Sequence, residues 1–255
     1  MKSREKFCAM GAALLCGGLL LTGSLISSPR RGAQDSPDES DSRIRIGFEI
    51  APVLLNLEGK NPALVGLGSY IVNTEGCNDC HSAGPPTQYA QGGNPYLGQP
   101  KKVNPATYLG GGRDFGKVFT APGGGPGIAG PNAPDIISRN LTPAPNNKTG
   151  LPGGDITFEK FLTIITTGED FDHLHPNCSV NVTTNCFSVN PAPTPSVDGD
   201  LLQVMPWPNF KDLREREIRA IYEYLKAVPC LQGNYPGPNG AAAGIPPEPA
   251  DRCSQ

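Results

Sequence analysis

Residues 77–81 of this 255-residue chain read CNDCH, and this run constrains the chain more than any other feature. Two cysteines separated by two residues, followed directly by a histidine, are the spacing of covalent c-type haem attachment. The two thiols add to the two haem vinyl groups, and the histidine can lie under the iron only if it follows the second cysteine directly. We therefore expect haem c on Cys77 and Cys80, with His81 as an axial ligand of the iron. No second run of this kind occurs, so the sequence predicts a single haem.

Three other interpretations of this run are weaker. A zinc ribbon needs a second close pair of ligands, and Cys178 and Cys186 are too far apart in the sequence to form one. A thioredoxin-like redox pair needs a βαβ setting, which the Gly- and Pro-rich continuation of the chain does not offer. A structural disulfide between Cys77 and Cys80 would not need the histidine that follows.

Few side chains are available for the opposite side of the iron. Apart from Met1 and Met10 in the N-terminal segment, Met205 is the only methionine, and the only other histidines are His173 and His175. Met205 lies in the run VMPWP, whose prolines fix the backbone around it, and methionine is a known axial ligand of haem c. We expect Met205 to be the second metal ligand. The two histidines, or no side chain at all, are the alternatives.

The first 28 residues are typical of an export signal, with basic residues at 1–6, an apolar run over 7–21 and small residues after it. The same segment is just long enough to serve as a membrane anchor. We therefore expect a bacterial protein that is exported to the periplasm, either free or anchored to the inner membrane. Residues 29–43 are polar and charged, which predicts a flexible linker.

Composition sets further limits. The 32 glycines and 28 prolines predict that loops outweigh helices. The formal net charge of −3 and the absence of a basic patch argue against nucleic acid as a partner. Cysteines of an exported chain can pair, and sequence distance favours Cys178–Cys186 and Cys230–Cys253 among three possible connectivities.

Helix signals recur along the chain. Asn61-Pro62 suits the start of a helix, and Thr157 suits the cap of another, in each case followed by apolar residues at helical spacing. The sequence predicts an extended arm or short strand within 44–60, helices over 61–76, 157–167 and about 212–227, and an irregular tail over 230–255. The long irregular stretch over 82–155 is expected to wrap around something.

Three blocks of the sequence resemble the mono-haem class I c-type cytochromes, especially the cytochrome domains paired with bacterial alcohol and sugar dehydrogenases. They are GSYIV through CNDCH, then SRNLTP with FEKFLTIITTGED, then MPWPNF with IRAIYEYLKAVP. The resemblance covers roughly residues 62–229. It implies a mainly α, class I cytochrome c fold over 44–229, in which a few helices and long Gly/Pro-rich loops surround one covalent haem. It also implies axial ligation by His81 and Met205.

The sequence departs from this family at several places. Arg214 stands near the position where family members usually carry a Ser, Thr or Asp cap, and both the 169–200 loop and the tail are longer than expected. Arg139 and Asn140 are candidates to bind the haem propionates, because a buried carboxylate needs a charged donor, although a surface or turn role suits them equally. Trp207 is a candidate to contact the haem edge.

These features favour a periplasmic electron-transfer protein that cycles one haem between Fe(II) and Fe(III), and not an enzyme, because both axial positions would be filled. The resemblance suggests a dehydrogenase as electron donor and an oxidase or soluble cytochrome as acceptor. The main alternative is a haem enzyme or gas-binding protein, such as a peroxidase-like protein, with a labile distal ligand. A structural subunit whose haem only staples the fold is a further alternative.

Overall fold

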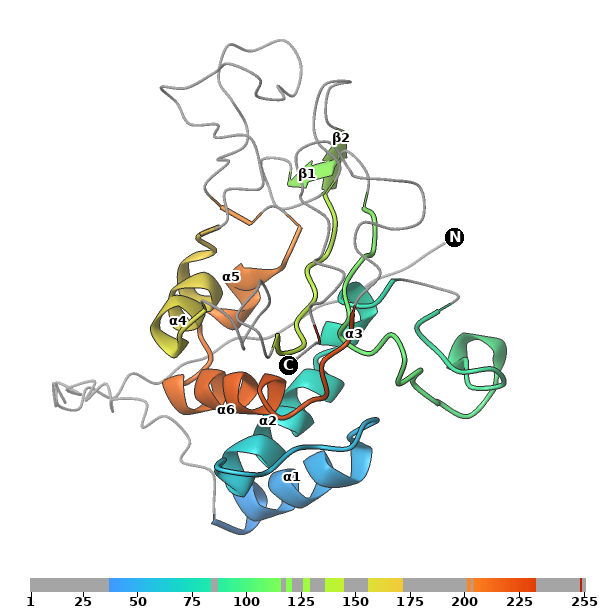
Figure 1. Ribbon diagram of the computed structural model, residues 1–255. Helices are drawn as coiled ribbons and strands as arrows, with labels where there is room; N and C mark the ends of the chain where they lie inside the picture. The colour runs from blue at the N-terminus through green and yellow to red at the C-terminus, as the bar shows by residue number, and fades with distance from the viewer. Residues whose placement is uncertain are drawn as a thin grey trace, which may run out of the picture. The chain divides into compact units, whose positions relative to one another are not determined.

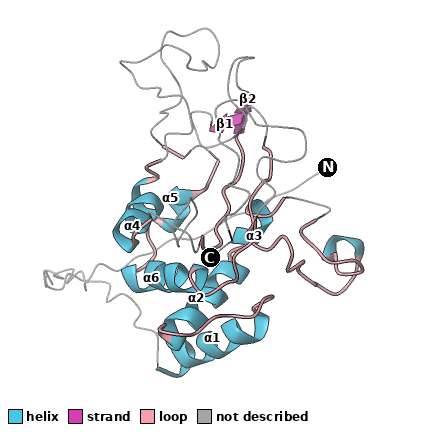
Figure 2. Ribbon diagram, in the orientation of Figure 1, coloured by secondary structure: helices cyan, strands magenta, loops and turns pink. Residues whose placement is uncertain are grey.

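The computed structural model describes residues 37–83, 87–115, 118–120, 126–128, 136–144, 156–171, 201–202, 204–232 and 253, all within one unit, Asp35–Gln255. This part of the chain is mainly helical, as the sequence predicts (Figures 1 and 2). Its elements in chain order are α1 (Pro37–Ile50), α2 (Pro62–Thr74), α3 (Cys77–Cys80), the 3-10 turn η1 (Pro95–Leu97), β1 (Val118–Thr120), β2 (Pro126–Ile128), α4 (Phe158–Thr167), α5 (Trp207–Phe210) and α6 (Glu215–Leu225). The two short strands pair antiparallel. None of these helices is long and apolar enough to cross a membrane.

Helix α2 is packed between α1 and α6, and glycines make both contacts close. A Cβ added at Gly68 would lie 1.9 Å from the carbonyl oxygen of Ala220 in α6. A Cβ added at Gly66 would lie 2.8 Å from the carbonyl oxygen of Ile44 in α1. Because neither glycine has a side chain, the backbones of the three helices approach one another more closely than larger residues would allow.

Helix α1 corrects two predictions from the sequence. Residues 37–43 are helical, where a flexible linker is predicted, and residues 44–50 continue that helix, where a strand or extended arm is predicted. The contacts that stabilise this helix are tertiary: the Ser69 hydroxyl donates a 2.6 Å hydrogen bond to the Gly47 carbonyl, and the Arg43 guanidinium lies 5.1 Å from the centre of the Tyr70 ring. A polar segment gives little local sign of a helix that is stabilised mainly by packing on its neighbours.

The caps of the other helices follow the sequence more closely. Asn61 caps α2 by accepting from the backbone N–H groups of Ala63 and Leu64, and Thr157 caps α4, so both predicted starts are confirmed. Helix α6 begins at Glu215, three residues after the predicted start at Asp212. The carboxylate of Glu217, in the first turn, accepts a 3.0 Å hydrogen bond from the Arg214 N–H. This bond gives a partner to a backbone N–H at the start of the helix that would otherwise have none.

A buried polar network joins the loop after the CNDCH run to helices α2 and α6 where they cross. The Tyr108 hydroxyl donates to the side chain of Asn73 in α2 and lies 2.8 Å from the Tyr224 hydroxyl of α6. Burial, with the neighbouring Tyr224 hydroxyl adding to it, raises the pKa of Tyr108 well above its usual value. Both tyrosines therefore stay neutral, and the loop that follows the CNDCH run is fixed to α2 and α6.

The contact at Gly68 yields a stability prediction. The substitution Gly68→Ala should lower the free energy of unfolding by about 1–3 kcal/mol, because the overpacking at Ala220 outweighs the gain of about 0.5–1 kcal/mol in helix propensity. Urea denaturation measures the change. A matched control is Gly110→Ala, whose Cβ would meet nothing nearer than the Thr107 oxygen at 3.4 Å, and it should change stability by less than about 0.5 kcal/mol. Equal effects of the two substitutions would contradict this account of the crossing.

Candidate functional site

A largely apolar cavity opens between the end of α2, α3, α4, α5 and α6. Its volume is about 190 Å³, whereas a single water occupies only about 10–15 Å³ of such a cavity. The apolar walls include Ile71, Val72, Phe161, Ile164, Ile221 and Leu225. A cavity of this size with such walls suits an apolar group much larger than water.

The two cysteines of the CNDCH run lie at the wall of this cavity. Gly76, with φ of 71°, provides the left-handed turn that separates α2 from the one-turn helix α3. Cys77 and Cys80 form no disulfide with each other. Burial, together with nearby Glu75, raises the pKa of the Cys77 thiol to about 12, and burial also raises the pKa of Cys80. Both groups are therefore neutral thiols at physiological pH.

His81 lines the same cavity and has a fixed tautomer. Its Nδ1 lies 2.8 Å from the carbonyl oxygen of Arg139. Since a carbonyl only accepts hydrogen bonds, Nδ1 carries the proton and Nε2 keeps a free electron pair. Burial lowers the pKa of His81, which favours the neutral ring. A neutral imidazole whose other nitrogen donates to a carbonyl is the usual arrangement of a metal-binding histidine.

A glycine-rich loop holds this histidine in place. The Gly111 N–H donates to the His81 carbonyl at 2.9 Å, and the Gly112 N–H donates to the Ser138 carbonyl at 2.9 Å. Gly111 has φ of 67°, and a Cβ there would lie 2.5 Å from the Arg139 carbonyl carbon. The first GGG run of the sequence therefore allows the backbones of the two loops to meet beside His81, a role that the sequence alone does not reveal.

Met205 reaches the cavity from the opposite end of the sequence. It is half-buried against the hydrophobic core, and its carbonyl accepts a 2.8 Å hydrogen bond from the Trp207 N–H at the start of α5. The fold thus brings Cys77, Cys80, His81 and Met205 to one cavity. The alternative ligands His173 and His175 lie outside the described residues.

Of the other candidate residues, one lines the cavity and two do not. Arg139 lines the cavity, and its guanidinium pairs with the fully buried Asp170. Asn140 and Trp207 are not among the lining residues. Trp207 packs on Gly168, where a Cβ would lie 2.2 Å from its ring, and its Nε1 donates to the Leu202 carbonyl.

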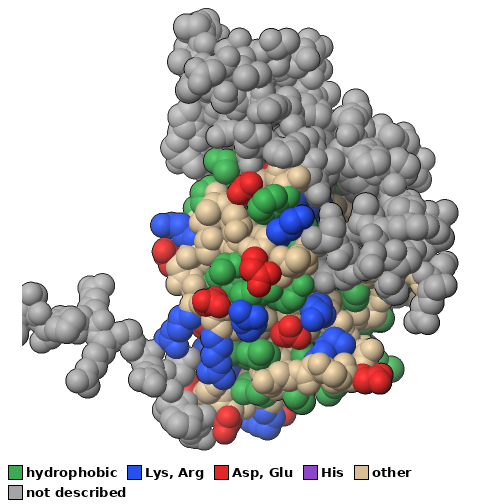
Figure 3. Space-filling model, turned by 60° about the vertical axis from the view of Figure 1, so that its left-hand side comes forward, with side chains coloured by type: hydrophobic (Ala, Val, Ile, Leu, Met, Phe, Trp, Pro, Cys, Tyr) green, Lys and Arg blue, Asp and Glu red, His purple; other side chains and the backbone are tan. Residues whose placement is uncertain are grey.

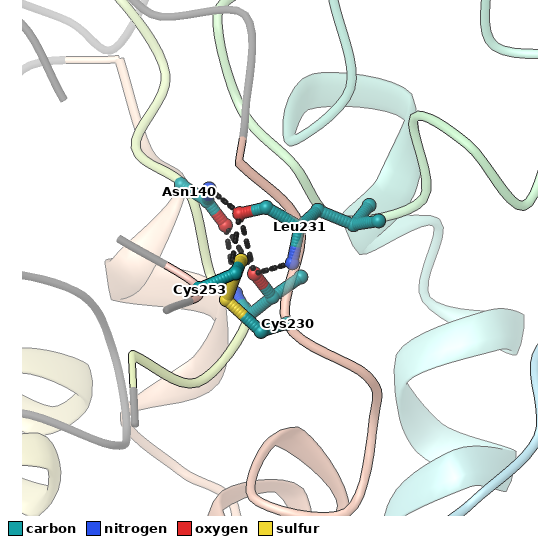
Figure 4. Close-up of a disulfide and its surroundings, with 5 residues drawn as sticks. Asn140, Cys230, Leu231 and Cys253 are labelled. Carbon is teal, nitrogen blue, oxygen red and sulfur yellow. Dashed lines mark hydrogen bonds between the residues drawn. A yellow bond between two sulfur atoms is a disulfide. The ribbon is translucent and has the colours of Figure 1, made fainter. Parts of the chain in front are cut away.

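The side chain of Asn140 bonds to other parts of the chain through both its oxygen and its nitrogen. Its Oδ1 accepts from the N–H and the hydroxyl of Thr142, and its Nδ2 donates to the Leu231 carbonyl at 3.0 Å (Figure 4). An amide that bonds to two segments of the chain in this way stabilises the loop, and it uses one of its two Nδ2 hydrogens to do so. The contacts therefore give Asn140 a structural role, and the propionate-binding role considered for it stays a prediction.

The predicted disulfide Cys230–Cys253 is present, beside this amide (Figure 4). The Leu231 N–H donates to the Thr142 hydroxyl at 3.0 Å, so the disulfide lies next to the segment that carries Arg139. The predicted pair Cys178–Cys186 lies outside the described residues. Within the described ranges, no group of three or more His, Cys, Asp or Glu side chains is arranged to hold a metal ion.

The ion pair behind the cavity yields a second prediction. Asp170→Asn removes the charge that Arg139 faces and should lower the free energy of unfolding by about 1.5–3 kcal/mol, the range for a hydrogen bond to a charged group. Thermal or urea denaturation measures it. The control Glu223→Gln weakens the more exposed pair with Lys226 and should cost less than about 1 kcal/mol. If both variants unfold alike, Asp170 does not brace this segment.

Comparisons with known proteins identify no relative. No family model matches the chain, and neither a curated protein nor a solved structure matches it. The functional assignment therefore depends on the residues of the site itself.

Proposed function

We propose that this chain is a mono-haem c-type cytochrome that carries electrons, with haem bound through Cys77 and Cys80 and with His81 and Met205 as axial ligands. One observation carries the proposal: the two thiols, the imidazole and the thioether, from distant parts of the sequence, line the same apolar cavity. These are the groups that the attachment and axial ligation of haem c require.

The state of each group fits this cofactor. The thiols are unpaired, and burial raises the pKa of both, whereas a redox-active cysteine pair has a lowered pKa. The His81 ring keeps Nε2 free for a metal. The apolar walls suit the face of a macrocycle, and Arg139, whose guanidinium pairs with Asp170, is the basic residue of the lining closest in kind to what its carboxylates need.

The fold supports the same assignment. Helix α2 leads into the CNDCH turn and crosses α6 at Gly68 and Ala220, and the family that the sequence resembles implies a haem held between two helices that cross each other. We include in the proposal export to the periplasm and exchange of electrons with a dehydrogenase donor and an oxidase or cytochrome acceptor.

The haem would supply a one-electron exchange between Fe(II) and Fe(III). The chain's own residues would set its conditions. The apolar walls exclude water, and the thioether of Met205 favours the reduced state more than a second imidazole would. If His81 and Met205 both hold the iron, no position would remain on it for a substrate, which would favour a carrier over an enzyme.

Covalent attachment is tested by Cys77→Ser with Cys80→Ser. The wild type, produced in a host that matures c-type cytochromes, should keep one haem through denaturation and show the mass of chain plus one haem, whereas the double variant should lose the haem. The control, Cys230→Ser with Cys253→Ser, removes the other described cysteine pair and should keep the haem. A wild-type chain without covalent haem would refute the proposal.

Axial ligation is tested by Met205→Ala. The oxidised wild type should show the weak absorption band at the red end of the visible spectrum that reports an iron–thioether bond, and its reduced form should bind CO slowly. Loss of Met205 should abolish the band and permit rapid CO binding. The control Val204→Ala, which changes a neighbouring residue of the cavity wall, should keep the band and the slow CO binding. Rapid CO binding by the wild type would favour a haem enzyme or gas-binding protein instead.

A further inference from the structure

Residues 87–104 leave the body of the molecule and return to it as a narrow loop. The Lys102 N–H donates to the Gly93 carbonyl and the Ala90 N–H to the Lys102 carbonyl, both at 2.9 Å, so residues 94–102 form the end of the loop, here called the tip. Figure 1 shows this loop, with the turn η1, standing out from the helices beyond α3. At its base, Gln88 donates to Asp79 of α3.

The tip is internally ordered and presents two large apolar side chains to solvent. Asn94 caps η1 by accepting from the Tyr96 N–H at 3.0 Å, and its own N–H donates to the Gln99 side chain at 3.0 Å. Tyr96 is 82% exposed and Leu97 is 72% exposed. Their apolar surface contributes little to the core, while their fixed backbone lowers the entropy that would be lost on binding.

Charge is segregated at the same place. Residues 82–112 contain no Asp or Glu, although the chain as a whole has a formal net charge of −3. Lys101 and Lys102 are exposed and form no ion pair with a described residue. On the face shown in Figure 3, in contrast, basic and acidic side chains are interspersed. The tip therefore combines exposed apolar side chains with uncompensated positive charge.

The small size of the tip decides which kind of partner it can bind. A stable protein interface buries about 800 Å² on each partner, which two side chains on a projecting loop do not provide. A lipid surface needs only a few apolar side chains that enter the headgroup boundary and cations that meet anionic lipids, and tyrosine is enriched at that depth. We propose that the tip docks on an anionic lipid bilayer, with Tyr96 and Leu97 inserted and Lys101 and Lys102 on the headgroups.

The test uses the full chain as purified, with mixed phosphatidylcholine–phosphatidylglycerol vesicles and with pure phosphatidylcholine vesicles. Hydrogen exchange, which locates binding along the chain, should show that the mixed vesicles protect residues 94–102, and protection should be weaker with the neutral vesicles. Tyr96→Ser with Leu97→Ser should lower vesicle affinity at this segment at least about tenfold, because a loss of one apolar anchor is already of that order. Lys101→Gln with Lys102→Gln should lower it about fivefold per lysine.

Two controls match these variants. Leu54→Ser removes another apolar side chain, 93% exposed, and Lys211→Gln removes another exposed positive charge; neither should alter protection of the tip. Equal urea midpoints of all variants show that folding is preserved. The proposal is overturned if vesicles leave 94–102 unprotected, as they would if the tip binds a protein instead, or if protection survives in the Tyr96/Leu97 variant. Hydrogen exchange at the tip and the urea midpoint do not depend on bound haem. A failure of this proposal can therefore be distinguished from a failure of the proposed function.

Discussion

The contact between Gly68 and Ala220 is the constraint on which the rest of the structure depends. A glycine against a backbone carbonyl lets α2 and α6 cross at close range, and the residues that follow along α2 then enter the core at a fixed depth. Helix α3 begins three residues after α2 ends, so this crossing sets where Cys77, Cys80 and His81 emerge. Gly66, on the α1 side, lets a third helix pack against α2 without moving it.

A second constraint is the segment over 138–141, which links the parts of the site. Its Arg139 carbonyl orients His81, and the Arg139 guanidinium pairs with the buried Asp170 after α4. The side chain of Asn140 ties the same segment to the Leu231 carbonyl, next to a disulfide. A short loop is thus anchored on both sides, which suits a residue whose carbonyl must hold an imidazole in one tautomer.

The large apolar cavity is the part of the interior that the proposed haem would fill. Side chains from α2, α4 and α6 face a shared space that they do not fill. A covalent macrocycle would complete that core, and its attachment at α3 would fix it to the part of the chain that the helix crossing already positions. In the proposed carrier, the same group would therefore supply both redox chemistry and packing.

Local rules could predict a large share of this protein. The CNDCH spacing and the caps at Asn61 and Thr157 depend on residues close together in the sequence, and Met205 follows from a count of residue types along the chain. The structure brings the CNDCH residues and Met205 to one cavity and confirms both caps.

What only the tertiary structure decided depends on distant contacts. Helix α1 exists in a polar segment because Gly47 meets Gly66, and the GGG run serves His81 because Gly111 meets Arg139. Asn140 braces a loop because Leu231 returns beside it. Sequence alone determined which groups can perform the chemistry, since that follows from residue type and spacing. Only folding decided which of them meet, since close approach between distant backbones leaves no local pattern.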